Sequence, residues 1–182
     1  MIIAISGVPG TGKTEIAKIL AKDLKANLID IKKLLDKKAV KYTNDEKRKT
    51  RVVDVRDLQE AVNKKLKDNK LNIIEGHLSH LLDVDMIIIL RTNPKVLRKR
   101  LKKRKWPETK IRENLEAEMI DEITVEALEK QKRTILEIDT SSKSVESAAK
   151  VIEKVLNSLP LQRKYEAGQI DWTERYKNEL TK

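Results

Sequence analysis

One stretch near the start of the chain decides the fold, Gly7-Val8-Pro9-Gly10-Thr11-Gly12-Lys13-Thr14. It fits the pattern G-x-x-x-x-G-K-[ST], in which glycines let the backbone bend until its N–H groups point inward at phosphate oxygens. Residues 2–6, which precede it, form the short apolar run of a buried strand, and residues 15–25, which follow it, have the pattern of a helix. Because that helix adds its positive N-terminal end, the arrangement predicts a site for a nucleoside triphosphate.

The polar residues of this loop predict how the nucleotide is held. Lys13 can reach the β- and γ-phosphates, and the hydroxyl of Thr14 can ligate Mg²⁺. ATP contacts are expected at Gly10, Gly12, Lys13, Thr14 and Glu15. The alternative is a chance glycine turn, but the strand, the Lys-Thr pair and the helix together argue against it. The sequence therefore predicts ATP and Mg²⁺ as ligands.

Composition and charge narrow the class of protein. The 182 residues suffice for one α/β domain, and the absence of cysteine excludes a disulfide framework and thiolate chemistry. No apolar stretch approaches the roughly 20 residues that cross a bilayer, and the start of the chain lacks a signal-peptide pattern. A cytoplasmic protein with no membrane partner is therefore expected. The formal net charge of +11 indicates anionic partners, nucleotides first and also RNA.

Short apolar runs alternate with helical patterns along the chain. Strands are predicted at residues 2–6, 27–30, 71–75, 86–91 and 134–139, and helices at residues 15–25, 31–35, 56–67, 95–104, 110–132 and 145–156. This alternation predicts an α/β fold of the P-loop NTPase type, with a five-stranded parallel sheet in the order 2-3-1-4-5 and helices on both faces. Ligands of such sheets bind at the carboxyl ends of the strands, where the loop, Asp30 and Glu75 fall.

A charged segment follows the second predicted strand. Residues 31–50 are too many and too charged for a plain connection, so an inserted helical flap for the phosphoryl acceptor is predicted over residues 30–54. Arg51 could clamp the phosphate of that acceptor. The alternative is a solvated loop in which Asp30 only caps a helix. Asp30 and Arg51 are therefore the predicted contacts to a nucleoside monophosphate.

The third predicted strand ends in Glu75-Gly76-His77. A carboxylate at such a strand end can hold Mg²⁺ through its water shell or orient an attacking oxygen. His77 could relay a proton or bond a phosphate oxygen. The alternative is that a lone histidine beside a turn is structural, and this is the expectation for His80, which lacks the same placement.

Residues 91–105 form a strongly basic segment, with nine Lys and Arg residues and no acid. Most of these side chains are expected on the solvated face of a helix. Pro107 breaks that helix and a second long helix follows, so a small lid is predicted at residues 103–114. Arg104 could swing over the triphosphate as the lid excludes water. Trp106 is expected to pack at the hinge rather than to stack on adenine.

The chain ends in a polar tail. Pro160 is expected to end the last helix of a domain that spans residues 1–159, which leaves residues 160–182 as the tail. Three of the five aromatic residues lie there: Tyr165, Trp172 and Tyr176. The tail is therefore expected to pack on its own core, the alternative being an arm that binds a partner.

Several of these motifs together resemble a known family, the adenylate-kinase-like proteins of archaea and the eukaryotic nucleus (the CINAP type), within the nucleoside monophosphate kinases. The resemblance covers residues 1 to about 157 and rests on the following segments: Gly7–Thr14, Arg51-Val52-Val53-Asp54, Glu75-Gly76-His77, and Arg104 with KIRENLEAE from Lys110 to Glu118. Lys143 resembles the residue of this family that contacts the nucleotide after the last strand. Two departures are Glu75, where the family has Asp, and the tail, which has no counterpart in the family pattern.

The resemblance implies a nucleoside monophosphate kinase of broad specificity that converts ATP and AMP to two ADP and also hydrolyses ATP. It further implies a role in maturation of the small ribosomal subunit, with a platform ribosomal protein and rRNA as partners. The catalytic residues would be Lys13, Arg104, Glu75 and His77, with Arg104 and Lys143 on ATP and with Thr14 and Glu75 (through water) on Mg²⁺. The alternatives are an ATP-hydrolysing ribosome assembly factor whose kinase activity is incidental, and a small-molecule kinase on the same fold.

Overall fold

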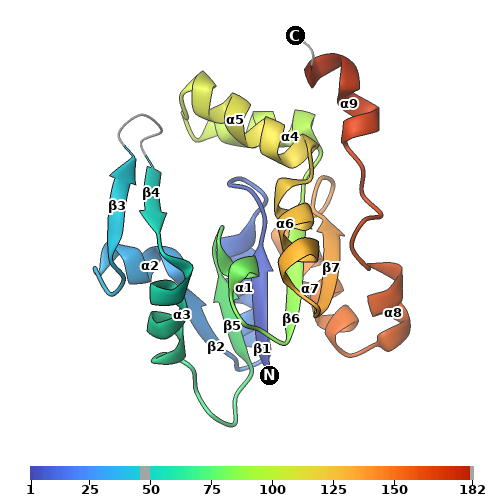
Figure 1. The fold of residues 1–182 in the computed structure, drawn as a ribbon. Coiled ribbons are helices and arrows are strands. Elements are labelled where there is room, and N and C mark those ends of the chain that lie inside the picture. The colour runs from blue at the N-terminus through green and yellow to red at the C-terminus, as the bar shows by residue number, and fades with distance from the viewer. Residues whose placement is uncertain (46–49, 181–182) are drawn as a thin grey trace.

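The main sheet brings the predicted loop to its carboxyl edge. The computed structural model describes residues 1–45 and 50–180. Five parallel strands lie in the following spatial order (Figure 1): β2 (Asn27–Asp30), β5 (Asn72–Glu75), β1 (Ile2–Ser6), β6 (Met86–Arg91) and β7 (Thr134–Asp139). Counted along the chain, this order is 2-3-1-4-5, which confirms the prediction. Four of these strands have the predicted bounds, and β5 starts one residue later.

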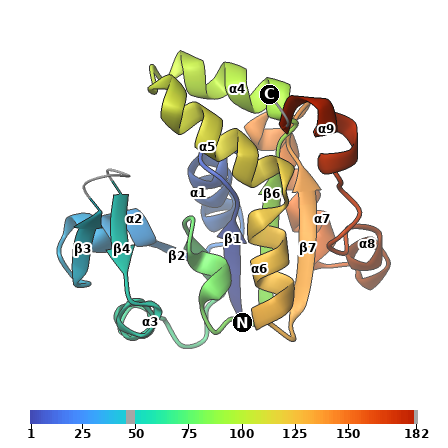
Figure 2. The same ribbon diagram turned by 45° about the horizontal axis from the view of Figure 1, so that its top comes forward.

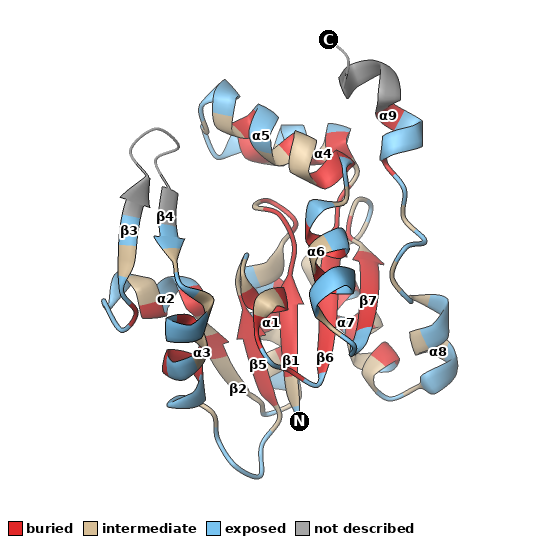
Figure 3. Ribbon diagram, in the orientation of Figure 1, coloured by how far each residue is buried: buried red, intermediate tan, exposed pale blue. Residues whose placement is uncertain are grey.

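Helices cover both faces of this sheet. Those that pack against it or continue from its carboxyl edge are α1 (Lys13–Asp23), α3 (Val55–Asn63), the short η1 (Ser79–Leu81), α4 (Pro94–Lys103), α5 (Glu108–Met119), α6 (Glu122–Lys130) and α7 (Val145–Leu156). Successive strand residues point to opposite faces. Ile3 and Ile5 therefore join the apolar cluster of α1 and α7, whereas Ala4 joins that of α3 and α6. Figure 3 shows the resulting buried central strands beneath helices with exposed outer faces.

The segment after β2 differs from the predicted helical flap. It begins with the short helix α2 (Ile31–Asp36) and continues as an antiparallel hairpin of β3 (Tyr42–Asp45) and β4 (Thr50–Val53). Tyr, Thr and Val favour strands, and this accounts for the hairpin within a charged stretch. Arg51 lies in β4 opposite Asn44, but its side chain lies outside the described residues.

The predicted helix over residues 110–132 is also wrong, because two helices, α5 and α6, take its place. The break is at Asp121, which has a left-handed backbone with φ of 58°. The Asp121 carboxylate is ion-paired with Arg91. α4 and α5 form a helical hairpin over the carboxyl edge of the sheet (Figures 1 and 2), and Trp106 in their turn packs against the core, as predicted.

The tail packs on its own core, which confirms the first of the two expectations for it. Pro160 does not end a helix: α7 stops at Leu156, and Pro160 lies in the first turn of α8 (Leu159–Lys164). After α8 the chain runs beside β7, and α9 (Thr173–Leu180) lies near α4 and α5 (Figure 1). The Glu137 N–H donates to the Tyr165 carbonyl at 2.8 Å, and Trp172 and Tyr176 are buried.

Within the described part of the chain, none of the helices combines the length and the apolar character needed to span a membrane.

Candidate active site

The phosphate-binding loop, residues 7–14, joins β1 to α1 and takes its shape from its glycines. Gly10 and Gly12 have φ of 98° and 100°, which side chains with a Cβ rarely adopt. A Cβ on Gly10 would also lie 2.7 Å from the Cδ1 of Leu97 in α4. Gly10 therefore allows α4 to pack directly on the loop, and Gly12 forms the N-terminal cap of α1.

Lys13 bends back over the loop. Its amine donates to the carbonyl of Gly7 at 2.7 Å and to that of Val8 at 3.1 Å. Burial lowers the pKa of Lys13 to about 8, while the charge of Glu75 opposes this shift and that of Arg104 adds to it. The amine is thus ready to exchange two carbonyl partners for anionic oxygens, which would satisfy its charge better.

Oxygen atoms gather where β1, β2 and β5 end. The Thr14 hydroxyl lies 3.4 Å from Glu75 Oε2, and Asp30 is the register neighbour of Glu75 in the sheet. Burial, and then the charge of Asp30, raises the pKa of the Glu75 carboxyl. Oxygen donors of this kind suit a hard divalent cation such as Mg²⁺. Asp30 also caps α2, since its Oδ1 accepts from the Lys33 N–H at 2.9 Å, as the alternative interpretation predicted.

The two histidines after β5 have different surroundings. The His77 imidazole lies beside the loop, with its Nδ1 3.5 Å from the Gly7 carbonyl oxygen. Desolvation, followed by the charge of Lys13, lowers the pKa of His77. His80 is buried, with Nδ1 3.0 Å from the Ser6 hydroxyl and Nε2 3.0 Å from Glu126, so it is structural, as expected.

A cavity of about 730 Å³ opens beside the loop. Its lining brings together five residues predicted to contact ATP, namely Gly10, Gly12, Glu15, Arg104 and Lys143. The Lys143 amine donates to the Asp139 carbonyl at 2.9 Å. Glu15 is exposed and ion-paired with Lys18 at 2.7 Å.

Arg100 lines the same cavity, and the sequence analysis did not single it out. Its Nη2 donates to the Thr140 carbonyl at 2.6 Å, and its Nη1 lies 3.4 Å from the Gly10 carbonyl oxygen. Its spacing could have identified Arg100 as a candidate, because it precedes Arg104 by four residues and so lies on the same helix face.

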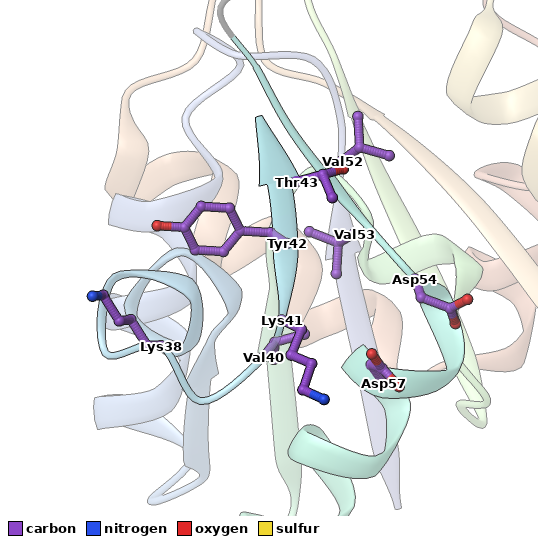
Figure 4. A pocket seen from close by; sticks show the side chains of 9 residues that line it. All are labelled: Lys38, Val40, Lys41, Tyr42, Thr43, Val52, Val53, Asp54 and Asp57. Atoms are coloured by element: carbon purple, nitrogen blue, oxygen red, sulfur yellow. The ribbon is translucent and has the colours of Figure 1, made fainter. Parts of the chain in front are cut away.

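A second cavity, of about 940 Å³, lies in the insert that follows the edge strand β2 (Figure 4). Its lining comes from the loop after α2, the hairpin and the start of α3, and consists of Lys38, Val40, Lys41, Tyr42, Thr43, Val52, Val53, Asp54 and Asp57. Asp54 caps α3, since its Oδ1 accepts from the Arg56 N–H at 2.7 Å. The predicted contact of Arg51 to an acceptor concerns a side chain outside the described residues.

Arg91 ends strand β6, as predicted, and unlike most of the basic segment of residues 91–105 it is buried. It is 2% exposed, and its Nε donates to Glu118 Oε1 at 3.0 Å. It also forms ion pairs with Glu137 and Asp121. The guanidinium therefore joins β6, β7 and the α5–α6 junction through buried charges.

Comparisons with known proteins agree with this architecture. The chain is 39% identical to a protein named "Putative adenylate kinase" from Thermococcus kodakarensis over 97% of this chain and 95% of that protein. It is 36% identical to a protein of the same name from Methanocaldococcus jannaschii over 100% and 98% of the two chains. The tail therefore has a counterpart in that relative, contrary to expectation.

Solved structures share the fold at low identity. A deoxyadenosine kinase from M. mycoides with bound dATP has a TM-score of 0.56 at 18% identity, and the match covers 87% of this chain and 100% of that one. The YorR protein from Bacillus subtilis, in complex with phosphorylated GDP, has a TM-score of 0.57 at 20% identity and covers 86% and 96%. A family model described as an AAA domain matches residues 3–121. The chain thus belongs to the AAA domain family and to the group of archaeal proteins named "Putative adenylate kinase".

Proposed function

We propose that this protein is a nucleoside monophosphate kinase that transfers a phosphoryl group from ATP to AMP and so forms two ADP. The observation that carries the proposal is the 730 Å³ cavity, where the phosphate-binding loop, Arg100 and Arg104 of the α4 end, and Lys143 meet. The name of the archaeal relatives supports the same reaction class. The 940 Å³ cavity of the insert is the proposed site of the nucleoside monophosphate. Arg51 would bind its phosphate, and Asp30 is the other proposed contact to this nucleotide.

The chain's own residues would act chiefly by positioning and by offsetting charge. An oxygen of the AMP phosphate forms a bond to the γ-phosphorus as the bond to the bridging oxygen of ADP breaks. The AMP phosphate is mainly a dianion near neutral pH, so the attacking oxygen carries no proton and no general base is needed. Lys13 and the loop N–H groups would hold the β- and γ-phosphates, and Arg104, in the proposed lid of residues 103–114, would offset charge as it develops.

The residues at the strand ends fit Mg²⁺. Thr14 would hold the ion directly and Glu75 would hold it through water, because the Thr14 hydroxyl and Glu75 Oε2 lie 3.4 Å apart beside the loop. When bound, Mg²⁺ offsets the negative charge of the phosphates. Glu75 is 4% exposed, and the Thr14 contact keeps its carboxylate oriented toward the loop.

The test is ATP turnover with and without AMP. Lys13→Ala should reduce AMP phosphorylation by more than about 100-fold, because it removes the cation on the transferred group. Lys18→Ala is the matched control, since Lys18 lies on the same helix but is exposed and paired with Glu15. Full activity of Lys13→Ala, or no ADP formed from AMP by the unaltered protein, would refute the proposal.

A second candidate function is favoured by a basic groove. A cavity of about 700 Å³ between α4 and α5 is lined by the cations Lys95, Arg98, Lys99, Lys102 and Arg112. Such a surface suits the phosphates of rRNA. In this alternative, the protein is a CINAP-type ribosome assembly factor that hydrolyses ATP, and its partners are rRNA and a platform ribosomal protein.

The two functions differ in how water and AMP compete for ATP. In the assembly-factor alternative, Glu75 and His77 orient a water molecule, hydrolysis proceeds without AMP, and added RNA or ribosomal protein changes its rate. Phosphorylation of AMP that is much faster than hydrolysis, with no effect of RNA, would favour the kinase.

A further inference from the structure

The tail reaches the buried charges beneath the α4–α5 hairpin. The Trp172 indole is 6% exposed, and its Nε1 donates to Glu118 Oε1 of α5 at 3.1 Å. The next residue, Thr173, donates from its hydroxyl to the Met119 carbonyl at 2.6 Å. The tail is therefore fixed to the end of α5 by two adjacent side chains, and only one of them contacts a charge.

Glu118 connects this contact to the edge of the sheet. The same carboxylate oxygen accepts from Arg91 Nε at 3.0 Å and from the backbone N–H of Thr92 at 2.9 Å. Because Glu118 is 2% exposed, water cannot readily replace a lost donor. The indole N–H thus helps to fix the carboxylate that fixes Thr92.

Thr92 in turn contacts two residues that line the nucleotide cavity, Thr140 and Arg100. Its hydroxyl lies 2.8 Å from that of Thr140, which also lies 3.0 Å from the Thr11 carbonyl oxygen in the phosphate-binding loop. Arg100 lies 3.3 Å from both hydroxyls. A continuous set of buried hydrogen bonds therefore runs from the tail to the loop.

We propose that Trp172 is a positioning residue for the nucleotide site. Its indole orients Glu118, and Glu118 in turn fixes Thr92. Thr92 then holds Thr140 and Arg100, whose side chains contact the phosphate-binding loop. The inference rests on the proposed function, because it assigns the tail a role in binding ATP. The indole does not reach the cavity, so it acts only through other residues.

The charges around Glu118 give the contact a pH dependence. Four charged groups surround the Glu118 carboxyl: Arg91 from β6, Glu137 from β7, Asp121 beyond α5 and, at longer range, Lys13. Burial raises the pKa of Glu118 to about 7, and Arg91 opposes that rise. The carboxylate form accepts all three N–H donors, so positioning weakens as the pH falls through this pKa. Loss of the indole donor should raise the pKa further and move the weakening to higher pH.

The experiment compares Trp172→Phe with Thr173→Val by calorimetric titration with ATP and Mg²⁺ between pH 6 and pH 8. Trp172→Phe keeps a large apolar ring but removes the donor, and it should weaken ATP binding about 3- to 10-fold at pH 7. The difference from the unaltered protein should shrink toward pH 6, where Glu118 is protonated in both proteins. Thr173→Val removes an adjacent tail hydrogen bond that does not contact Glu118, and it should leave ATP affinity and its pH profile unchanged.

A second variant tests the route. Thr92→Val removes the hydroxyl that passes the effect to Thr140 and Arg100, so in a Thr92→Val background Trp172→Phe should add little further loss. Additive losses would overturn the inference, as would normal ATP affinity in Trp172→Phe or equal losses in both tail variants. If the unaltered protein binds no ATP, the proposed function falls together with this inference. If it binds ATP and Trp172→Phe binds equally well, only the inference fails.

Discussion

Replacing Arg91 tests whether the buried charges hold the site's framework together. Arg91→Met keeps most of the side-chain volume but removes the cation that pairs with three carboxylates, those of Glu118, Asp121 and Glu137. Glu118 and Glu137 have exposed side-chain fractions of 2% and 1%. Removing one partner of a buried ion pair costs about 3–5 kcal/mol because the remaining charge has no compensation. For a chain of this size, that loss lowers the melting temperature by about 6–20 °C.

Arg98→Met is the matched control. Arg98 pairs with Glu108 on the surface, where the two side chains are 45% and 59% exposed. Such pairs contribute about 0–1 kcal/mol because water screens them. Urea unfolding of both variants measures the two costs directly. A loss below about 1 kcal/mol for Arg91→Met, or one equal to that of Arg98→Met, would refute the reasoning.

The pH dependence of this loss has a definite sign. Burial already raises the pKa of Glu118 to about 7, and without Arg91 it should rise further. The folded variant then binds a proton that the unfolded chain releases above its own pKa of about 4.3, so its stability increases as the pH falls. The destabilisation by Arg91→Met should therefore be largest near about pH 8 and smaller near about pH 5. A loss that is constant over this range would contradict the role of Glu118.

Three further predictions concern the proposed reaction. ATP affinity should fall as the pH rises through about 8, because only the protonated amine of Lys13 attracts the triphosphate, and calorimetry that shows constant affinity to pH 10 would contradict this. Arg104→Ala should slow transfer to AMP by about two to three powers of ten in a coupled assay, and a loss no larger than that of Lys105→Ala would make Arg104 mere surface charge. His77→Ala should reduce hydrolysis more than transfer, whereas equal losses would exclude a water-orienting role.

The sheet could be predicted because its signals are local. Apolar runs such as residues 86–91 lie between polar segments, and side chains on both faces of a central strand are buried, so length and composition alone identify the strand. Helix starts were equally local. Asn93 accepts from the Lys95 N–H before α4, and Ser144 accepts from the Ser147 N–H before α7, as the capping rules predict.

The failures arose where tertiary contacts overrode a local pattern. The amphipathic pattern of residues 110–132 continues through Asp121, but the ion pair with Arg91 accompanies a left-handed residue there. The hairpin was missed because its strands are short and lie in a charged segment, so hydrophobic alternation gave no signal. Pro160 was interpreted as a stop signal, although proline is equally suited to the first turn of a helix.

The proposed site residues differ from the residues that support them in the same way: the former follow from local patterns and the latter from long-range contacts. Lys13, Thr14 and Glu75, which we propose as site residues, are local to a loop or a strand end, so spacing alone predicts them. Trp172 contacts Glu118 across 54 positions of the chain, and a polar tail gives no sign of which buried carboxylate it will meet. A hydrogen-bond donor matters most where water cannot replace it. We therefore expect the residues that hold the loop in place to make buried, long-range contacts. For this reason a substitution in the tail tests a site whose loop lies at the opposite end of the sequence.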